Sequence, residues 1–203
     1  SVQSGQVYGF VGPNGAGKST TIKIALGLLR PDSGEVGFFG QNSQNYRARA
    51  RVGFVPEEPN LYDHLTGKEF LYFASRLAGV SKQDISTKTN RLLERVNMME
   101  AGERRLRTYS KGMQQRLALA QALVGDPELI IMDEPLSGLD PVGRMEIQGL
   151  ISSLKEQGKT IFFSSHILSD VESICDQVAL IINGEIKYTG TPENIEETFK
   201  EML

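Results

Sequence analysis

Nine consecutive residues near the start of this chain of 203 residues have the types and spacing best suited to bind an anion. They are Gly12, Pro13, Asn14, Gly15, Ala16, Gly17, Lys18, Ser19 and Thr20. Glycines let the backbone curl so that successive N–H groups point into one concavity. The lysine and the hydroxyl side chains add positive charge and further donors. The segment therefore predicts a binding site for a polyphosphate.

The surroundings of this segment strengthen the prediction. An apolar, strand-like run at residues 6–11 precedes it, and a helical pattern at residues 18–28 follows it. Strand, glycine-rich loop and helix with the spacing G-x-x-x-x-G-K-[ST] form a P-loop. The positive end of the helix would repel Lys18 unless an anion lay between them. We expect Ser19 to hold Mg²⁺ and Thr20 to contact an inner phosphate. A flexible glycine turn beside a solvated lysine is the alternative.

Two carboxylates follow another apolar strand. Residues 128–132 predict a buried strand, and Asp133 and Glu134 come directly after it. A carboxylate at the carboxyl end of a parallel strand lies in the crevice where such sheets bind ligands. We expect Asp133 to bind Mg²⁺ through a water. Glu134 is the candidate base that orients or deprotonates an attacking water. A solvated acidic turn is the alternative.

Two further segments carry polar side chains at the ends of predicted elements. His166 follows the strand predicted at residues 159–164, and so belongs to the same sheet edge as the two carboxylates. Its imidazole could hydrogen-bond a terminal phosphate, or it could be a structural or surface residue. Ser110 could be only the N-cap of the helix that follows it. Together with Lys111 and Gly112, however, it also presents a second helix N-terminus to an anion.

Strand-like and helix-like patterns alternate along the chain. Strands are predicted at residues 6–11, 35–39, 52–55, 128–132, 159–164, 177–182 and 185–189. Helices are predicted at residues 18–28, 66–77, 84–96, 110–124, 141–156 and 169–175. This alternation predicts an α/β fold with a mainly parallel sheet. Residues 55–110 hold two helical patterns and few strand signals, and they predict a helical subdomain inserted between sheet strands. Asn183-Gly184 predicts a tight hairpin turn.

Local signals also mark the starts of helices. Thr66 with Glu69, and Ser169 with Glu172, have the spacing of a capping box. Asp140 is followed by proline, which is typical of an N-cap and the first helical position.

The composition limits the classes of function. The net charge is −3 at pH 7, and 39% of residues are hydrophobic and 23% charged, as in ordinary globular domains. This charge indicates neither a nucleic-acid partner nor a polybasic membrane anchor. The single cysteine, Cys175, cannot form an internal disulfide and fits a reducing compartment. No apolar run in the sequence approaches the roughly 18 residues that cross a bilayer. We therefore expect any membrane role to come through a partner.

The order of the motifs carries a resemblance to a known family. The P-loop is followed by Ser110–Arg116, Asp133-Glu134-Pro135, Ser137–Asp140 and His166. This order resembles the nucleotide-binding subunit of an ABC transporter over essentially the whole chain. The resemblance implies an ABC-type ATPase domain over residues 1–203. Its P-loop NTPase core would have a mainly parallel sheet, an inserted helical subdomain at residues 55–110, a truncated antiparallel β-subdomain, and a C-terminal hairpin and helix at residues 177–203.

The resemblance also implies partners and roles. Such subunits hydrolyse ATP with Mg²⁺ and close head to tail as a homodimer, or with a paired ATPase subunit, around two ATP molecules. Lys18, Glu134 and His166 would then surround the γ-phosphate. Ser110, Lys111 and Gly112 of one subunit would face the P-loop of the other, and Asp140 would couple the two sites. A separate transmembrane permease would hold the subunit on the cytoplasmic face of the cell membrane.

Two departures from the family pattern concern the site. The signature reads Tyr-Ser-Lys-Gly-Met at Tyr109–Met113, where the family usually has Leu-Ser-Gly-Gly-Gln. Glu57 stands where the family generally has a glutamine that binds Mg²⁺. A glutamine both donates and accepts hydrogen bonds, whereas an ionised glutamate only accepts them. Both variants resemble ATPases of exporter-type systems, so we expect export.

A third departure concerns the start of the sequence. The family carries about two antiparallel strands before the P-loop strand, with an aromatic residue that stacks on adenine. Tyr8 lies inside the P-loop strand, so it cannot supply this contact. A stacked base is worth about 1–3 kcal/mol in comparable sites. We therefore expect weak nucleotide affinity for the given segment, and an exposed edge in its antiparallel region.

Other classes of function share some of these motifs. A soluble ABC-type ATPase acting on a nucleic-acid or ribosomal assembly would usually carry a second ATPase copy, a coiled-coil insertion or basic surfaces. A P-loop kinase of small metabolites would not need the segment Ser110–Arg116. A binding module without turnover is disfavoured by Glu134.

Overall fold

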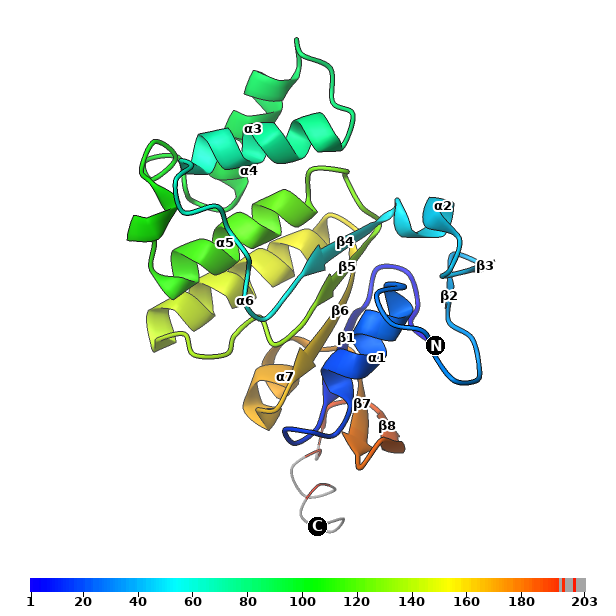
Figure 1. Cartoon of the computed structure of the whole chain (residues 1–203). Coiled ribbons are helices and arrows are strands. Elements are labelled where there is room, and N and C mark those ends of the chain that lie inside the picture. Colours follow the sequence, from blue (N-terminus) through cyan, green and yellow to red (C-terminus); the bar gives the residue numbers. More distant parts are fainter. Residues whose placement is uncertain (194, 196–198, 200–203) are drawn as a thin grey trace.

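The computed structural model describes residues 1–193, 195 and 199 and shows an α/β architecture (Figure 1). Its main sheet has the strand order β4-β5-β6-β1-β7-β8. The strands are β1 (Val7–Val11), β4 (Val52–Val55), β5 (Leu129–Met132), β6 (Thr160–Ser165), β7 (Gln177–Ile182) and β8 (Glu185–Gly190). The predicted α/β fold with a mainly parallel sheet is confirmed.

The P-loop strand lies in the middle of this sheet. β1 pairs in parallel with β6 on one side and with β7 on the other, and β5 pairs in parallel with β6. Only β8 runs antiparallel among the described strands of this sheet. It joins β7 through Asn183 and Gly184, whose φ angles of 50° and 80° confirm the predicted tight turn.

Helices cover both faces of the sheet, since neighbouring residues of a strand point to opposite sides. On one face, Ile130 and Phe163 belong to a large core that also includes Leu117 of α5 (Lys111–Ala122). α6 (Pro141–Glu156) and α7 (Leu168–Ile174) cover the same face (Figure 1). On the other face, Ile131 packs with Ile22 of α1 (Lys18–Ala25).

Two more helices stack on α5 (Figure 1). They are α3 (Gly67–Leu77) and α4 (Ile85–Arg95), and a 3₁₀ turn at Leu106–Thr108 follows them. The predicted capping box at the start of α3 is confirmed. Thr66 accepts a hydrogen bond from the Glu69 N–H, and the Glu69 carboxylate accepts one from the Thr66 N–H at 2.7 Å. The Asp140 cap of α6 is also confirmed, through the Gly143 N–H at 2.9 Å.

Several local predictions are wrong. The strand expected at residues 35–39 is reduced to β2 (Gly37–Phe38), because Phe39 and Gly40 both adopt positive φ and turn the chain into β3 (Gln41–Asn42). The short helix α2 (Tyr46–Arg49) had no expected counterpart.

The capping box expected at Ser169 and Glu172 is also wrong. α7 begins earlier, at Leu168, so Ser169 lies inside the helix, and Ile167 occupies the N-cap position. The helix expected after the β7–β8 hairpin falls largely on residues outside the described part of the chain. Among the helices that the structure describes, none is both long enough and apolar enough to cross a membrane.

Candidate functional site

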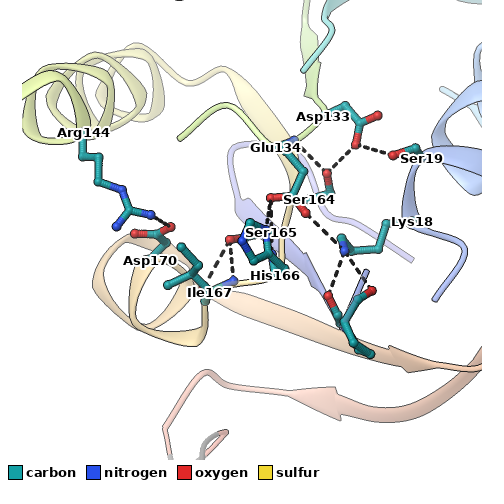
Figure 2. A network of polar contacts seen from close by, with 12 residues as sticks. Lys18, Ser19, Asp133, Glu134, Arg144, Ser164, Ser165, His166, Ile167 and Asp170 are labelled. Carbon is teal, nitrogen blue, oxygen red and sulfur yellow. Dashed lines mark hydrogen bonds and ion pairs between the residues drawn. The ribbon is translucent and has the colours of Figure 1, made fainter. Parts of the chain in front are cut away.

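The P-loop, the two carboxylates and the histidine meet at one edge of the sheet (Figure 2). β1, β5 and β6 are parallel, and their carboxyl ends lead into the P-loop, Asp133-Glu134 and His166, respectively. This edge is where open α/β sheets bind ligands. A cavity of about 480 Å³ lies there, lined by most of the P-loop together with Glu57, Glu134, Ser137 and His166.

The P-loop backbone has little room for side chains at its start. A Cβ atom added to Gly12 would lie 2.2 Å from the carbonyl oxygen of Ile181. Gly15 and Gly17 have φ angles of 81° and 104°, in the region that favours glycine. Gly17 is the N-cap of α1, so the first N–H groups of that helix are left for a ligand. Ala16 turns its side chain into the core instead. This cradle of backbone donors fits a phosphate chain.

Lys18 extends back across the cradle. Its ammonium donates to the carbonyl oxygens of Gly12 at 2.8 Å and Pro13 at 3.2 Å. It also lies 3.1 Å from Oε1 of Glu134 (Figure 2). The side chain is only 5% exposed, so its charge acts in a poorly solvated place. A buried cation beside free backbone donors suits a triphosphate.

Asp133 is held by two hydroxyl groups. Its Oδ1 accepts hydrogen bonds from Ser19 Oγ at 3.1 Å and from Ser164 Oγ at 2.7 Å. A carboxylate and a hydroxyl are hard oxygen ligands, and Mg²⁺ takes one or two such groups together with waters and phosphates. Within the described residues, no three carboxylate, histidine or cysteine side chains gather to hold a metal by themselves. Ser19 and Asp133 therefore fit a Mg²⁺ ion whose remaining ligands come from a nucleotide and water.

Glu134 is buried and contacts three groups of the site. Its Oε2 lies 2.8 Å from Nδ1 of His166, and its own N–H donates to Ser164 Oγ at 2.9 Å. Its Oε1 faces Lys18 as an ion pair, but among the described residues it has no hydrogen bond of good geometry. The backbone at Glu134 adopts φ 49°, an uncommon value for a residue other than glycine. Oε1 is therefore buried against Lys18, and it would meet a water molecule only after Lys18 turned to another anion.

The structure does not bring all predicted site residues to this cavity. Gly12, Pro13, Ala16 and Asp133 lie next to lining residues but are not themselves among the described residues that line it. Ser110, Lys111, Gly112 and Asp140 are not among them either. Ser110 caps α5 through the Met113 N–H at 3.3 Å. Glu57 is exposed at the cavity, and its carbonyl oxygen accepts from the side chain of Gln115.

A pair of charged residues, which the sequence did not suggest, supports the helix after His166. Asp170 of α7 is buried and accepts a hydrogen bond from Arg144 of α6 at 2.9 Å (Figure 2). Burial raises the pKa of Asp170, while Arg144 acts in the opposite direction. The pair fixes α7 to α6, the helix that Asp140 caps. Nothing in the spacing of these two residues marked them as partners.

Comparisons with known proteins agree with this geometry. A family model described as ABC transporter matches residues 1–137. An ABC transporter ATP-binding protein of Synechocystis is 46% identical over 193 residues, which are 94% of this chain and 54% of that protein. The lantibiotic transport ATP-binding protein SrtF of Streptococcus pyogenes is 39% identical over 207 residues, covering 100% of this chain and 88% of SrtF.

A solved structure described as the ATP binding subunit of an ABC transporter has the same fold. It superimposes with a TM-score of 0.83 at 33% identity, over 98% of this chain and 84% of the other. The chain spans little more than half the length of the Synechocystis relative. The family model covers more than half of the chain and the similarity to SrtF extends along all of it, so this chain belongs to the ABC transporter family.

Proposed function

We propose that this chain binds and hydrolyses ATP and powers transport through a separate transmembrane permease. The observation that carries the proposal is the meeting of Lys18, Glu134 and His166 in one cavity that opens on the P-loop. The cation of Lys18 and the imidazole of His166 each lie within hydrogen-bond reach of the candidate base Glu134. Hydrolysis of the phosphoanhydride bond of a nucleoside triphosphate depends mainly on such positioning and on electrostatic stabilisation.

The nucleotide would bind through its phosphates. The N–H groups of Asn14, Gly15 and Gly17 and of the first helical turn would donate to the β- and γ-phosphates, since those of Gly12 and Ala16 already donate to backbone carbonyl oxygens. Lys18 would move its ammonium from Glu134 to these oxygens, and Thr20, exposed at the cavity, would contact an inner phosphate. Pro13, Asn14, Gly15 and Ala16 form the part of the loop that would wrap around the phosphates.

Ser19 and Asp133 would hold Mg²⁺, with Glu57 at the edge of the same cavity as a further oxygen ligand. The ion would neutralise charge on the phosphates. Once Lys18 had turned to the phosphates, Oε1 of Glu134 would orient the attacking water and accept its proton. His166 holds the other oxygen of Glu134, so it would fix the direction of the carboxylate and reach the γ-phosphate.

We further propose that two copies, or this chain and a paired ATPase subunit, sandwich two ATP molecules. The support is that Ser110, Lys111, Gly112 and Asp140 are not among the described residues that line the P-loop cavity. A Cβ atom on Gly112 would lie 3.9 Å from Leu139, so the signature and the loop before Asp140 are neighbours. A ligand that touched both the P-loop cavity and the signature would need two subunits.

The permease would dock on the helical region of residues 55–110, beside Glu57. Tyr62, Tyr72, Phe73 and Leu77 are exposed there, which is typical of an interaction surface. SrtF, similar along the whole chain, is named for lantibiotic transport, and this name favours an exporter over a soluble ATPase of a nucleic-acid assembly. The subunit would then work at the cytoplasmic face of the cell membrane.

The test uses the substitution Glu134→Gln. The variant should bind ATP with Mg²⁺ as the wild-type chain does, hydrolyse it at least about 100-fold more slowly, and accumulate as a dimer in gel filtration with ATP. Glu185→Gln, on the exposed β8 strand, is the control for loss of one carboxylate and should behave as wild type. Normal turnover by Glu134→Gln, with monomer alone in the presence of ATP, would refute the role given to Glu134. Co-purification with a membrane protein would test the permease.

A further inference from the structure

Ser164 is a buried polar residue near the carboxyl end of β6, directly after the apolar run Ile161–Phe163. It lies in β6 beside Phe163, and its exposed fraction is 0%. Its position in the strand suggests core packing, and its side chain is small. The structure nevertheless gives its hydroxyl two partners at the candidate site (Figure 2).

The direction of these two hydrogen bonds is fixed by chemistry. A serine hydroxyl has one proton to donate and two lone pairs to accept with. The backbone N–H of Glu134 can only donate, so Ser164 Oγ accepts from it at 2.9 Å. The ionised carboxylate of Asp133 can only accept, so Ser164 donates its proton to Oδ1 at 2.7 Å. One hydroxyl therefore holds a side chain of the metal site and the backbone of the candidate base.

The two residues that Ser164 holds both need such support. Oδ1 of Asp133 also accepts from Ser19, whose oxygen would turn to the metal when Mg²⁺ binds. The bond from Ser164 would then remain to orient the carboxylate. Glu134 has a strained backbone at φ 49°, and such conformations persist where neighbouring groups hold them.

We propose that Ser164 is a positioning residue that couples the Mg²⁺ site to the hydrolytic carboxylate. Its hydroxyl sets the orientation of Asp133 toward the metal and the direction in which Glu134 leaves β5. This inference rests on the proposed ATPase function and adds to it a residue that touches neither nucleotide nor water. Groups that orient metal ligands in this way typically change metal affinity or activity by about 10–100-fold when removed.

The experiment compares three substitutions at this position with one matched control. Ser164→Ala removes both hydrogen bonds, and Ser164→Cys removes the strong donor but fills the space. Ser164→Thr keeps the hydroxyl, and a β-branched side chain suits a strand. The control is Thr160→Val, at the other end of the same strand, where the buried hydroxyl accepts from the Gly5 N–H at 3.0 Å.

Two measurements are made on each variant. The first is the affinity for Mn²⁺, followed by electron paramagnetic resonance in the presence of a non-hydrolysable ATP analogue. The second is the rate of ATP hydrolysis as a function of Mg²⁺ concentration, which separates kcat from the half-saturating metal concentration. Thermal unfolding without nucleotide reports whether each variant is folded.

We expect Ser164→Ala and Ser164→Cys to weaken Mn²⁺ binding by about 10–100-fold and to lower kcat. Ser164→Thr should recover most of both, and Thr160→Val should match wild type in metal affinity. Wild-type metal affinity and kcat in folded Ser164→Ala or Ser164→Cys would overturn the inference. So would a loss that Ser164→Thr fails to recover while it remains folded, because the residue would then serve packing alone. If wild type itself binds no Mn²⁺ with the analogue, the proposed function fails instead.

Discussion

The ammonium of Lys18 and Oε1 of Glu134 lie 3.1 Å apart, and both side chains are buried. The P-loop cation is therefore paired with the candidate base. A phosphate that enters the cradle must compete with this carboxylate for the lysine. Binding of the triphosphate would release Glu134 from Lys18 at the moment when a water needs a base. The Lys18–Glu134 ion pair should also contribute to the free energy of unfolding of the chain.

Lys18→Ala should destabilise the chain by about 3–5 kcal/mol, because it leaves the Glu134 carboxylate buried without its cation. The double variant Lys18→Ala/Glu134→Gln should recover part of this loss, since a neutral amide is less costly to bury. Urea denaturation of wild type, both single variants and the double variant gives the coupling free energy of the pair. Strictly additive changes would show that the pair contributes nothing to stability.

Gly12 lies very close to β7, the strand beside β1, and this contact gives a second prediction. Gly12→Ala places a Cβ atom 2.2 Å from the Ile181 carbonyl oxygen, which cannot move without disturbing β7. We expect a loss of about 1–3 kcal/mol in the free energy of unfolding. Gly149→Ala is the matched control, because Gly149 is exposed within α6 and an added Cβ meets open space. That variant should gain about 0.5–1 kcal/mol. Equal behaviour of the two would contradict the packing argument.

Much of the fold could be predicted because its signals are local. Asp140 and the proline after it define the start of α6, and Asn183-Gly184 defines the β7–β8 turn. The turn at Phe39-Gly40 was missed because a phenylalanine with φ 53° is held by its surroundings rather than by its own preference. Arg51 lies over its ring at 3.9 Å. That contact comes from elsewhere in the chain, so the local sequence does not show it.

The residues of the candidate site likewise fall into those that the local sequence indicates and those that it does not. Lys18, Asp133 and Glu134 were found because each follows a strand in a recognisable spacing. Ser164 was missed, because a serine inside a buried strand carries no signal of which partner it meets. The start of α7 was misplaced for a related reason. Arg144 holds this helix through a contact with Asp170, whereas the expected capping serine does not act as a cap.

The Arg144–Asp170 pair makes the stability of one variant depend on pH. Arg144→Met leaves the Asp170 carboxylate buried without its cation, so we expect a loss of about 3 kcal/mol at pH 7. Burial already raises the pKa of Asp170, and removal of Arg144 should raise it further. A carboxyl group with a raised folded pKa stabilises the folded state below its unfolded pKa of about 3.9, and this contribution is lost as pH rises. The deficit relative to wild type should therefore grow from acid toward neutral pH.

Urea denaturation at a series of pH values measures this deficit. The control is Arg144→Met/Asp170→Asn, in which the titrating group is gone, so its difference from Arg144→Met should shrink toward acid pH. A deficit in Arg144→Met that is the same at pH 4 and pH 7 would show that Asp170 stays ionised without its partner.

Asp176 provides a pH dependence of the opposite sign. It accepts the Val7 N–H at the start of β1 at 2.9 Å and pairs with Lys155 at 2.5 Å. Burial alone would raise the pKa of Asp176, but Lys155 and the Val7 amide outweigh it and the pKa lies below its ordinary value. The stabilisation is present above the unfolded pKa of about 3.9 and is lost as pH falls through the folded pKa. Asp176→Asn should lower the free energy of unfolding by about 1 kcal/mol at pH 7.

This difference between Asp176→Asn and wild type should disappear in acid, where the wild-type carboxyl is protonated and resembles the amide. The matched control is Asp126→Asn, because Asp126 pairs with Lys159 at the surface with 78% of its side chain exposed. Exposed pairs contribute about 0–1 kcal/mol, so this variant should change stability less at every pH. Denaturation of the three proteins between pH 3 and pH 7 separates the two cases. A difference for Asp176→Asn that persisted unchanged at pH 3 would mean that packing, and not the charge at the start of the P-loop strand, anchors β1.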